Sequence, residues 1–99
     1  MRVAYTEQAI RSLQEALDFI ASEVTEEKLN EIRDEILDTS ETLASQPYLG
    51  QEEPILEYLG LGHRRLLVGK YKIIYRISEE CIYITDIFDT RQYPSKMKG

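Results

Sequence analysis

The stretch that decides the fold runs from His63 to Ile77 and reads HRRLLVGKYKIIYRI. Gly69 separates two runs of strand-forming residues, and the side chains in each run alternate with the period of two that is typical of a β-strand. This pattern predicts strands over residues 63–68 and 70–77. In the second strand one face carries Tyr71, Ile73, Tyr75 and Ile77, and the other carries Lys72, Ile74 and Arg76.

The residues on either side extend this pattern. The run IYITDIFD, which begins at Ile82, predicts a third strand over residues 81–88, and turns as short as those between these strands make neighbours antiparallel. Residues 2–5 are expected to form a short extended segment, the first strand. Thr6 and Thr25 are each followed by glutamate, which predicts the starts of two amphipathic helices. Proline and glycine in the segment 46–50 end the second helix.

The predicted order is β-α-α-β-β-β within a single domain spanning residues 1–99. This order predicts an α+β fold of two layers, in which a helical hairpin packs on one face of a small antiparallel sheet. Two helices cover only one face of such a sheet, so we expect the other face to be uncovered and to carry Lys72 and Arg76. The tail over residues 93–99 is polar, and we expect it to be loosely ordered.

The charge is divided unevenly along the chain. Residues 63–99 carry eight Lys or Arg and four Asp or Glu, a balance of +4, whereas residues 1–62 carry four basic and fourteen acidic residues, a balance of −10. An acidic protein that concentrates its cations on one small sheet is expected to meet an anion there.

The composition excludes several classes of protein. The apolar content of 42% and the charged content of 30% are ordinary for a packed globular domain. No apolar run approaches the roughly 18 residues that span a bilayer, and the first residues lack the apolar segment of a secretory signal. Because the chain has one cysteine, Cys81, and one histidine, we expect no disulfide, no metal site, no cofactor and a cytoplasmic location.

Three sets of side chains are candidates for a functional site. A basic set would bind phosphate through its guanidinium and ammonium groups, unless these cations form a solvated face that pairs with nearby acids. This set comprises Arg64, Arg65, Lys72, Arg76 and Arg91. His63 has the chemistry of a general base or acid near neutral pH, although a lone histidine between a loop and a strand is more often structural. Tyr93 is free to contact a partner.

The predicted element order, together with HRRLLVGKYKIIYRI at residues 63–77 and IYITDIFDTRQYP at residues 82–94, resembles the RelE/ParE superfamily of type II toxins. The resemblance covers essentially the whole chain, beginning with VAYTEQAIRSLQEALDFI at residues 3–20. It implies a toxin made beside a small antitoxin, which would wrap the helices and the sheet of the toxin. The acidic helices predict an antitoxin segment that is apolar and carries basic residues.

The superfamily has two functional branches. RelE-like members cleave mRNA on the ribosome, whereas ParE-like members poison DNA gyrase and lack the ribonuclease residues. By position in the motif, Arg65 and Lys72 would hold the scissile phosphate of a ribonuclease, and Arg91 would offset charge on the phosphorane. The base would have to be His63 or an adjacent acid or lysine.

The sequence departs from the ribonuclease branch at one position. The tyrosine that RelE carries shortly after the last arginine falls near Met97 here, and Tyr93 is not an obvious substitute. We therefore predict a ParE-like toxin that binds gyrase, with Arg64, Arg76 and Tyr93 as candidate contacts to its target. The alternatives are a RelE-like, metal-independent endoribonuclease that acts on the ribosome and mRNA, and an inactive relative that only binds its antitoxin.

Overall fold

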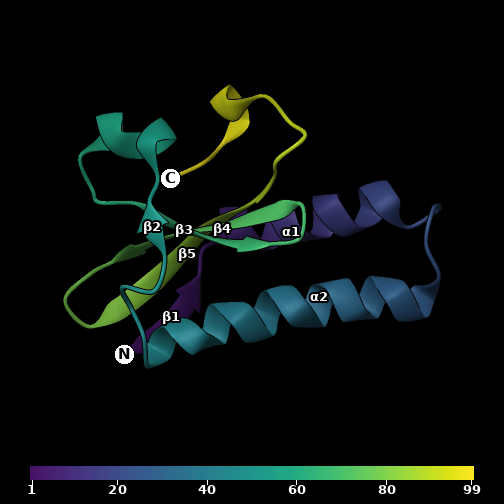
Figure 1. Ribbon diagram of the computed structural model, residues 1–99, viewed down its shortest axis with the longest axis horizontal. Coiled ribbons are helices and arrows are strands. Elements are labelled where there is room, and N and C mark those ends of the chain that lie inside the picture. Colours follow the sequence, from purple (N-terminus) through teal and green to yellow (C-terminus); the bar gives the residue numbers. More distant parts are fainter.

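The computed structural model describes residues 1–99, and Figure 1 shows the arrangement of its helices and strands. The helices are α1 (Glu7–Ile20) and α2 (Glu26–Glu41), and the strands are β1 (Arg2–Tyr5), β2 (Gln51–Glu52), β3 (Arg64–Val68), β4 (Tyr71–Ile77) and β5 (Cys81–Asp89). Three short 3-10 helices complete the chain: η1 (Thr42–Ala44), η2 (Pro54–Leu59) and η3 (Pro94–Lys96). None of the helices combines the length and the apolar character that crossing a bilayer requires.

The five strands form one sheet in the order β1-β5-β4-β3-β2. β3, β4 and β5 are antiparallel neighbours, as their short connections predict. β1 instead runs parallel to β5, and it pairs only with the first half of that strand, residues 81–84. The predicted α+β class is confirmed, with a mixed sheet in place of a wholly antiparallel one. The two-residue strand β2 was not predicted, because two residues cannot show an alternation.

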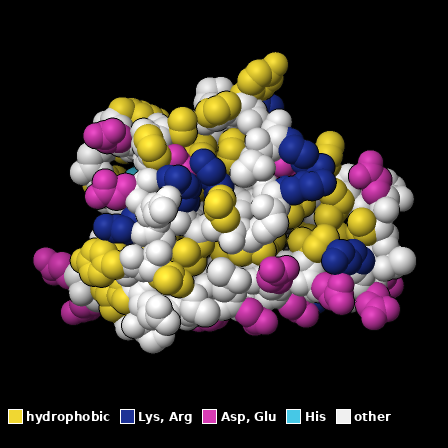
Figure 2. Space-filling model, in the orientation of Figure 1, with side chains coloured by type: hydrophobic (Ala, Val, Ile, Leu, Met, Phe, Trp, Pro, Cys, Tyr) yellow, Lys and Arg dark blue, Asp and Glu magenta, His cyan; other side chains and the backbone are white.

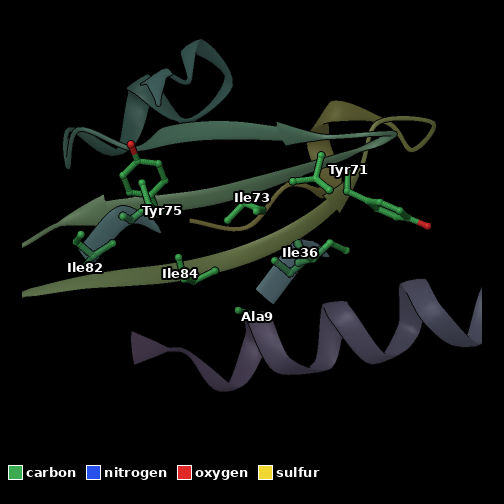
Figure 3. Packing of buried hydrophobic residues seen from close by; sticks show 10 residues of the cluster. Ala9, Ile36, Tyr71, Ile73, Tyr75, Ile82 and Ile84 are labelled. Carbon is green, nitrogen blue, oxygen red and sulfur yellow. The ribbon is translucent and has the colours of Figure 1, made fainter. Parts of the chain in front are cut away.

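Both helices begin where the sequence predicts. The hydroxyl oxygens of Thr6 and Thr25 accept hydrogen bonds from the backbone N–H of Ala9 and Lys28, each at 3.1 Å. The helical hairpin covers one face of the sheet, called here the helix face. Figure 3 shows Ile73 and Ile84 directed from the sheet into the space between it and Ala9 of α1, where Ile36 of α2 also lies.

Tyr75 ties this core to the segment that follows α2. Its ring is fully buried, and its hydroxyl donates to the carbonyl of Pro47 and accepts from the N–H of Gly50, both at 2.9 Å. A Cβ on Gly50 would lie 2.5 Å from the carbonyl oxygen of Arg65, so only glycine fits beside the tyrosine. The chain is therefore held against the sheet at the point where it leaves the hairpin.

The opposite face of the sheet, called here the second face, is not uncovered as the sequence predicted. η2 and the segment Pro94–Gly99 lie over it, on the side of the sheet opposite α2 (Figure 1). They enclose a second apolar cluster made by Leu56, Ile74, Phe88 and Met97. The tail also differs from the loosely ordered segment expected from its polarity, since Met97 is only 6% exposed.

We predict that Tyr75→Phe lowers the free energy of unfolding by about 1–3 kcal/mol, because it leaves a buried N–H and a carbonyl without their partner. Denaturant unfolding would measure the loss. Tyr83→Phe is the matched control, since the Tyr83 hydroxyl makes no hydrogen bond within the protein and its removal should change stability little. Equal effects of the two substitutions would contradict the role given to the Tyr75 hydroxyl.

Candidate functional site

The strand register divides the candidate cations between the two faces of the sheet. Arg65 lies opposite Ile74, and Arg76 lies opposite Tyr83, so both belong to the second face together with Lys72. Arg64 lies opposite Tyr75 and belongs to the helix face. Figure 2 accordingly shows Lys and Arg side chains in separate groups rather than in one continuous basic patch.

Arg65 and Lys72 are brought together by a carboxylate that the sequence analysis did not single out. Glu53, at the start of η2, is 3% exposed, and its Oε1 accepts a hydrogen bond from Lys72 Nζ at 2.8 Å. Its Oε2 lies 4.0 Å from Arg65 Nη1 and accepts the N–H of Ile55 at 3.2 Å. Arg65 also donates to the carbonyl of Glu52 at 2.6 Å. An internal carboxylate therefore occupies the position between these cations where an external phosphate would have to bind.

Two further arginines are engaged in packing. Arg64 donates to the carbonyl of Gly50 at 2.7 Å, and its guanidinium lies 5.0 Å from the ring centroid of Tyr48. Arg76 lies 4.8 Å from the ring centroid of Tyr83, its cross-strand neighbour. Both contacts have the geometry of cation–π pairs, which stabilise exposed sites modestly.

Arg91 is directed towards α1 and not towards the concavity that holds Lys72. It forms a bidentate pair with Asp89, with Nε–Oδ1 at 2.9 Å and Nη2–Oδ2 at 2.6 Å, and it lies 5.8 Å from the ring of Phe19. The hydrogen bonds from Arg91 hold the pKa of Asp89 below its usual value. Arg91 therefore does not share a site with Arg65 and Lys72, because a carboxylate two residues away and an aromatic ring on α1 engage it.

Arg91 instead lines a groove of about 810 Å³ between α1 and the tail. Lys96 and Lys98 on the tail, Phe19 on α1 and the buried Asp86 on β5 also line it. Burial raises the pKa of Asp86, whose carboxylate accepts the N–H of Lys98 at 2.9 Å. The sequence analysis missed these residues, since only the folded tail brings residues 96–98 beside α1.

His63 is buried rather than presented at the surface. It is 3% exposed, and neither ring nitrogen has a hydrogen-bond partner. Desolvation, and secondarily the charge of Arg76, lower its pKa, so the ring is neutral at neutral pH. Tyr93 is 77% exposed, and its backbone carbonyl accepts a hydrogen bond from the N–H of Lys96 at 2.9 Å.

The candidates therefore form no joint catalytic arrangement. Arg65 and Lys72 share one carboxylate, Arg91 lies in a different groove, and His63 is enclosed. No group of three or more His, Cys, Asp or Glu side chains is placed to hold a metal ion. What the geometry offers is a set of cations held in fixed positions by internal partners, which suits recognition by shape and charge better than proton transfer.

Comparisons with known proteins agree with this fold. The sequence matches the family described as "ParE toxin of type II toxin-antitoxin system, parDE" over residues 3–94. A solved structure titled "Chromosomal ParDE TA system from P. aeruginosa" superposes with a TM-score of 0.73 at 20% identity, covering 90% of this chain and 95% of that one. No curated protein sequence matches the chain.

The fold and the sequence thus define a toxin of the type II toxin–antitoxin class. Within that class, the chain belongs to the ParE toxin family. The predicted resemblance to the RelE/ParE superfamily is confirmed on its ParE side.

We predict that Glu53→Gln destabilises the fold by about 1–3 kcal/mol, because Lys72 and Arg65 lose the carboxylate that neutralises them. Sulfate should restore part of this loss by binding the freed cations, whereas sodium chloride at equal ionic strength should not. Thermal unfolding in the two salts measures both effects. Glu52→Gln is the matched control, since the Glu52 side chain is 84% exposed. Unchanged stability in Glu53→Gln would show that the carboxylate is dispensable.

A second prediction concerns His63. Replacing it by leucine should raise the free energy of unfolding by about 1–3 kcal/mol, because it removes buried polar atoms that lack partners. A histidine whose pKa is lowered on folding stabilises the protein less as the pH falls below its ordinary value of 6.5, so the advantage of leucine should grow in that direction. Denaturant unfolding across this pH range tests the prediction, and a marked loss of stability at neutral pH would contradict it.

Proposed function

We propose that this protein inhibits growth in the cytoplasm by binding DNA gyrase, and that a cognate antitoxin encoded with it neutralises it. Its membership of the ParE toxin family supports a toxin of this kind. The choice of protein binding over RNA cleavage rests on the geometry of the candidate site.

The observation that carries this choice is the engagement of Lys72 by Glu53. A ribonuclease of the RelE type would need Lys72 and Arg65 free to bind the scissile phosphate, together with an accessible base. Here the buried carboxylate of Glu53 lies 2.8 Å from Lys72 Nζ, and the only histidine is enclosed. Displacing Glu53 would leave a buried charge without a partner, which is costly.

The segment from Tyr48 to Leu61 offers a surface for a protein partner. It carries several large apolar side chains that are exposed: Tyr48, Leu49, Ile55, Tyr58, Leu59 and Leu61. Figure 2 shows hydrophobic side chains on the surface around η2. Exposed tyrosine and leucine within one segment suit a protein interface, where aromatic residues contribute most of the binding energy.

The antitoxin is expected to meet the acidic side of the molecule. Acidic side chains are distributed along both helices of the hairpin and the connection between them: Glu15, Asp18, Glu23, Glu26, Glu27, Glu31, Asp34, Glu35, Asp38 and Glu41. Opposite charge on a partner would accelerate association and orient it, and this contribution should weaken as salt is added.

We predict that expressing this chain alone arrests growth with gyrase-linked DNA breaks and intact messages. Mapping of mRNA 5′ ends and a plasmid-supercoiling assay in the same cells distinguish this outcome from ribonuclease action. New cleavage sites inside translated messages would overturn the proposal in favour of the RelE-like alternative, and no arrest would indicate an inactive relative.

The double substitution Glu53→Gln with Lys72→Met sharpens this test. It removes both charges of the buried pair, which costs less stability than removing one. A gyrase-binding toxin should arrest growth as the unsubstituted chain does, whereas a ribonuclease that uses Lys72 should become harmless. Arg91→Ala is a second variant of the same kind, at a side chain that lies in a separate groove. It should leave the toxicity of a gyrase-binding toxin unchanged and abolish that of a ribonuclease that uses Arg91.

A further inference from the structure

We propose that the segment Pro94–Gly99 is a proton-sensitive strap, closed over the second face of the sheet while His63 is neutral and released when His63 is protonated. This inference does not depend on the identity of the toxin's target. It rests on the contacts that close the segment and on the placement of the histidine beneath it.

A small number of contacts hold the strap closed. Met97 inserts its side chain into the second apolar cluster, beside Leu56, Ile74 and Phe88. The N–H of Lys98 donates to Asp86 Oδ2 at 2.9 Å, and the Thr85 hydroxyl donates to the carbonyl of Lys98 at 3.4 Å. One buried side chain and two hydrogen bonds are a small part of the contacts that hold the domain together, so the strap can open without unfolding of the sheet.

The last residue of the strap packs directly on His63. A Cβ built on Gly99 would lie 2.9 Å from His63 Nε2 and 2.5 Å from Leu59 Cδ1, which shows how closely the backbone approaches the ring. Both imidazole nitrogens are buried and without hydrogen-bond partners. Protonating the ring would place a charge where neither nitrogen has a hydrogen-bond acceptor, so protonation favours a state in which the strap has moved away from the ring.

The charges around His63 act in the same direction. Arg76 on β4 repels a charged ring and lowers its pKa, after the larger effect of desolvation. Glu52, Glu53 and Glu57 line the pocket beside the ring. Glu53 is paired with Lys72, however, and neither of the other two contributes to the shift in the His63 pKa.

The sign of the pH dependence follows from this placement. The open strap leaves His63 near its ordinary pKa of 6.5, whereas the closed strap lowers it, so the open state binds more protons and gains population as the pH falls below 6.5. Asp86, beneath Lys98, acts oppositely, because burial raises its pKa and closure then favours its protonated form. This opposing effect begins at the ordinary Asp86 pKa of 3.8 and extends upward from it, so an Asp86 variant is needed to separate it from the effect of His63.

The test is amide hydrogen exchange at Lys98 on the full chain, corrected for intrinsic exchange rates. Its protection factor should fall by up to about tenfold between about pH 7.5 and about pH 5.5. One pH unit below a pKa near 6.5, the protonated form of the open state is about ten times as abundant as its neutral form, and the closed state gains no such form. Protection of amides in β4 should stay constant. Protection at Lys98 that is independent of pH would overturn the proposal.

Two variants separate the histidine from other acidic groups. His63→Leu should keep the strap closed and make the protection of Lys98 independent of pH, whereas Asp86→Asn should retain the pH dependence. Should His63→Leu fail to fold, the ring signals of His63 in the unsubstituted chain give the same answer by NMR titration. The His63 ring and the Met97 methyl should then titrate together, and titration of His63 with no change at Met97 would refute the strap.

Discussion

Burial of β4 on both of its faces is the constraint on which the rest of the structure depends. Ile73 and Ile74 are adjacent in the chain, point to opposite faces and are both fully buried. A strand enclosed in this way needs a cover on each side, since two exposed isoleucines would forfeit several kcal/mol of hydrophobic stabilisation. The helical hairpin supplies one cover. η2 and the tail supply the other, and their positions determine which cations remain accessible.

Local patterns allowed the sequence to predict much of this fold. Strand alternation in β3, β4 and β5 and the threonine caps of α1 and α2 depend on residues near one another in the chain, and each was confirmed. The second cover escaped prediction because Ile74 stands between Lys72 and Arg76 in the polar half of the alternation. Leu56 and Met97, which pack on Ile74 in this cluster, lie in segments outside the long helices and strands, where no period identifies a buried face.

The candidate site was predictable in its residue types but not in its partners. Sequence showed that the cations gather after residue 63. Six of the eight lie on β3 or β4 or within two residues of a strand end, and the other two, Lys96 and Lys98, lie on the tail. The carboxylate that neutralises Lys72 belongs to Glu53, which lies nineteen residues earlier in the chain, at the start of the short helix η2. Side-chain pairs over such distances follow from packing of the loop, which local propensity does not encode. The enclosure of His63 has the same origin.

The parallel pairing of β1 with β5 has a consequence for how the protein folds during its synthesis. β1, at one edge of the sheet, pairs with residues of β5 that lie about eighty positions later in the chain. Contacts over such a separation raise the mean contact order and slow folding. During synthesis, β1 and both helices emerge well before β5, so they cannot pack on the complete sheet until β5 has been made. An amphipathic hairpin is therefore exposed on the nascent chain before the toxin is complete, and a partner that binds it then would meet the protein before its native surface exists.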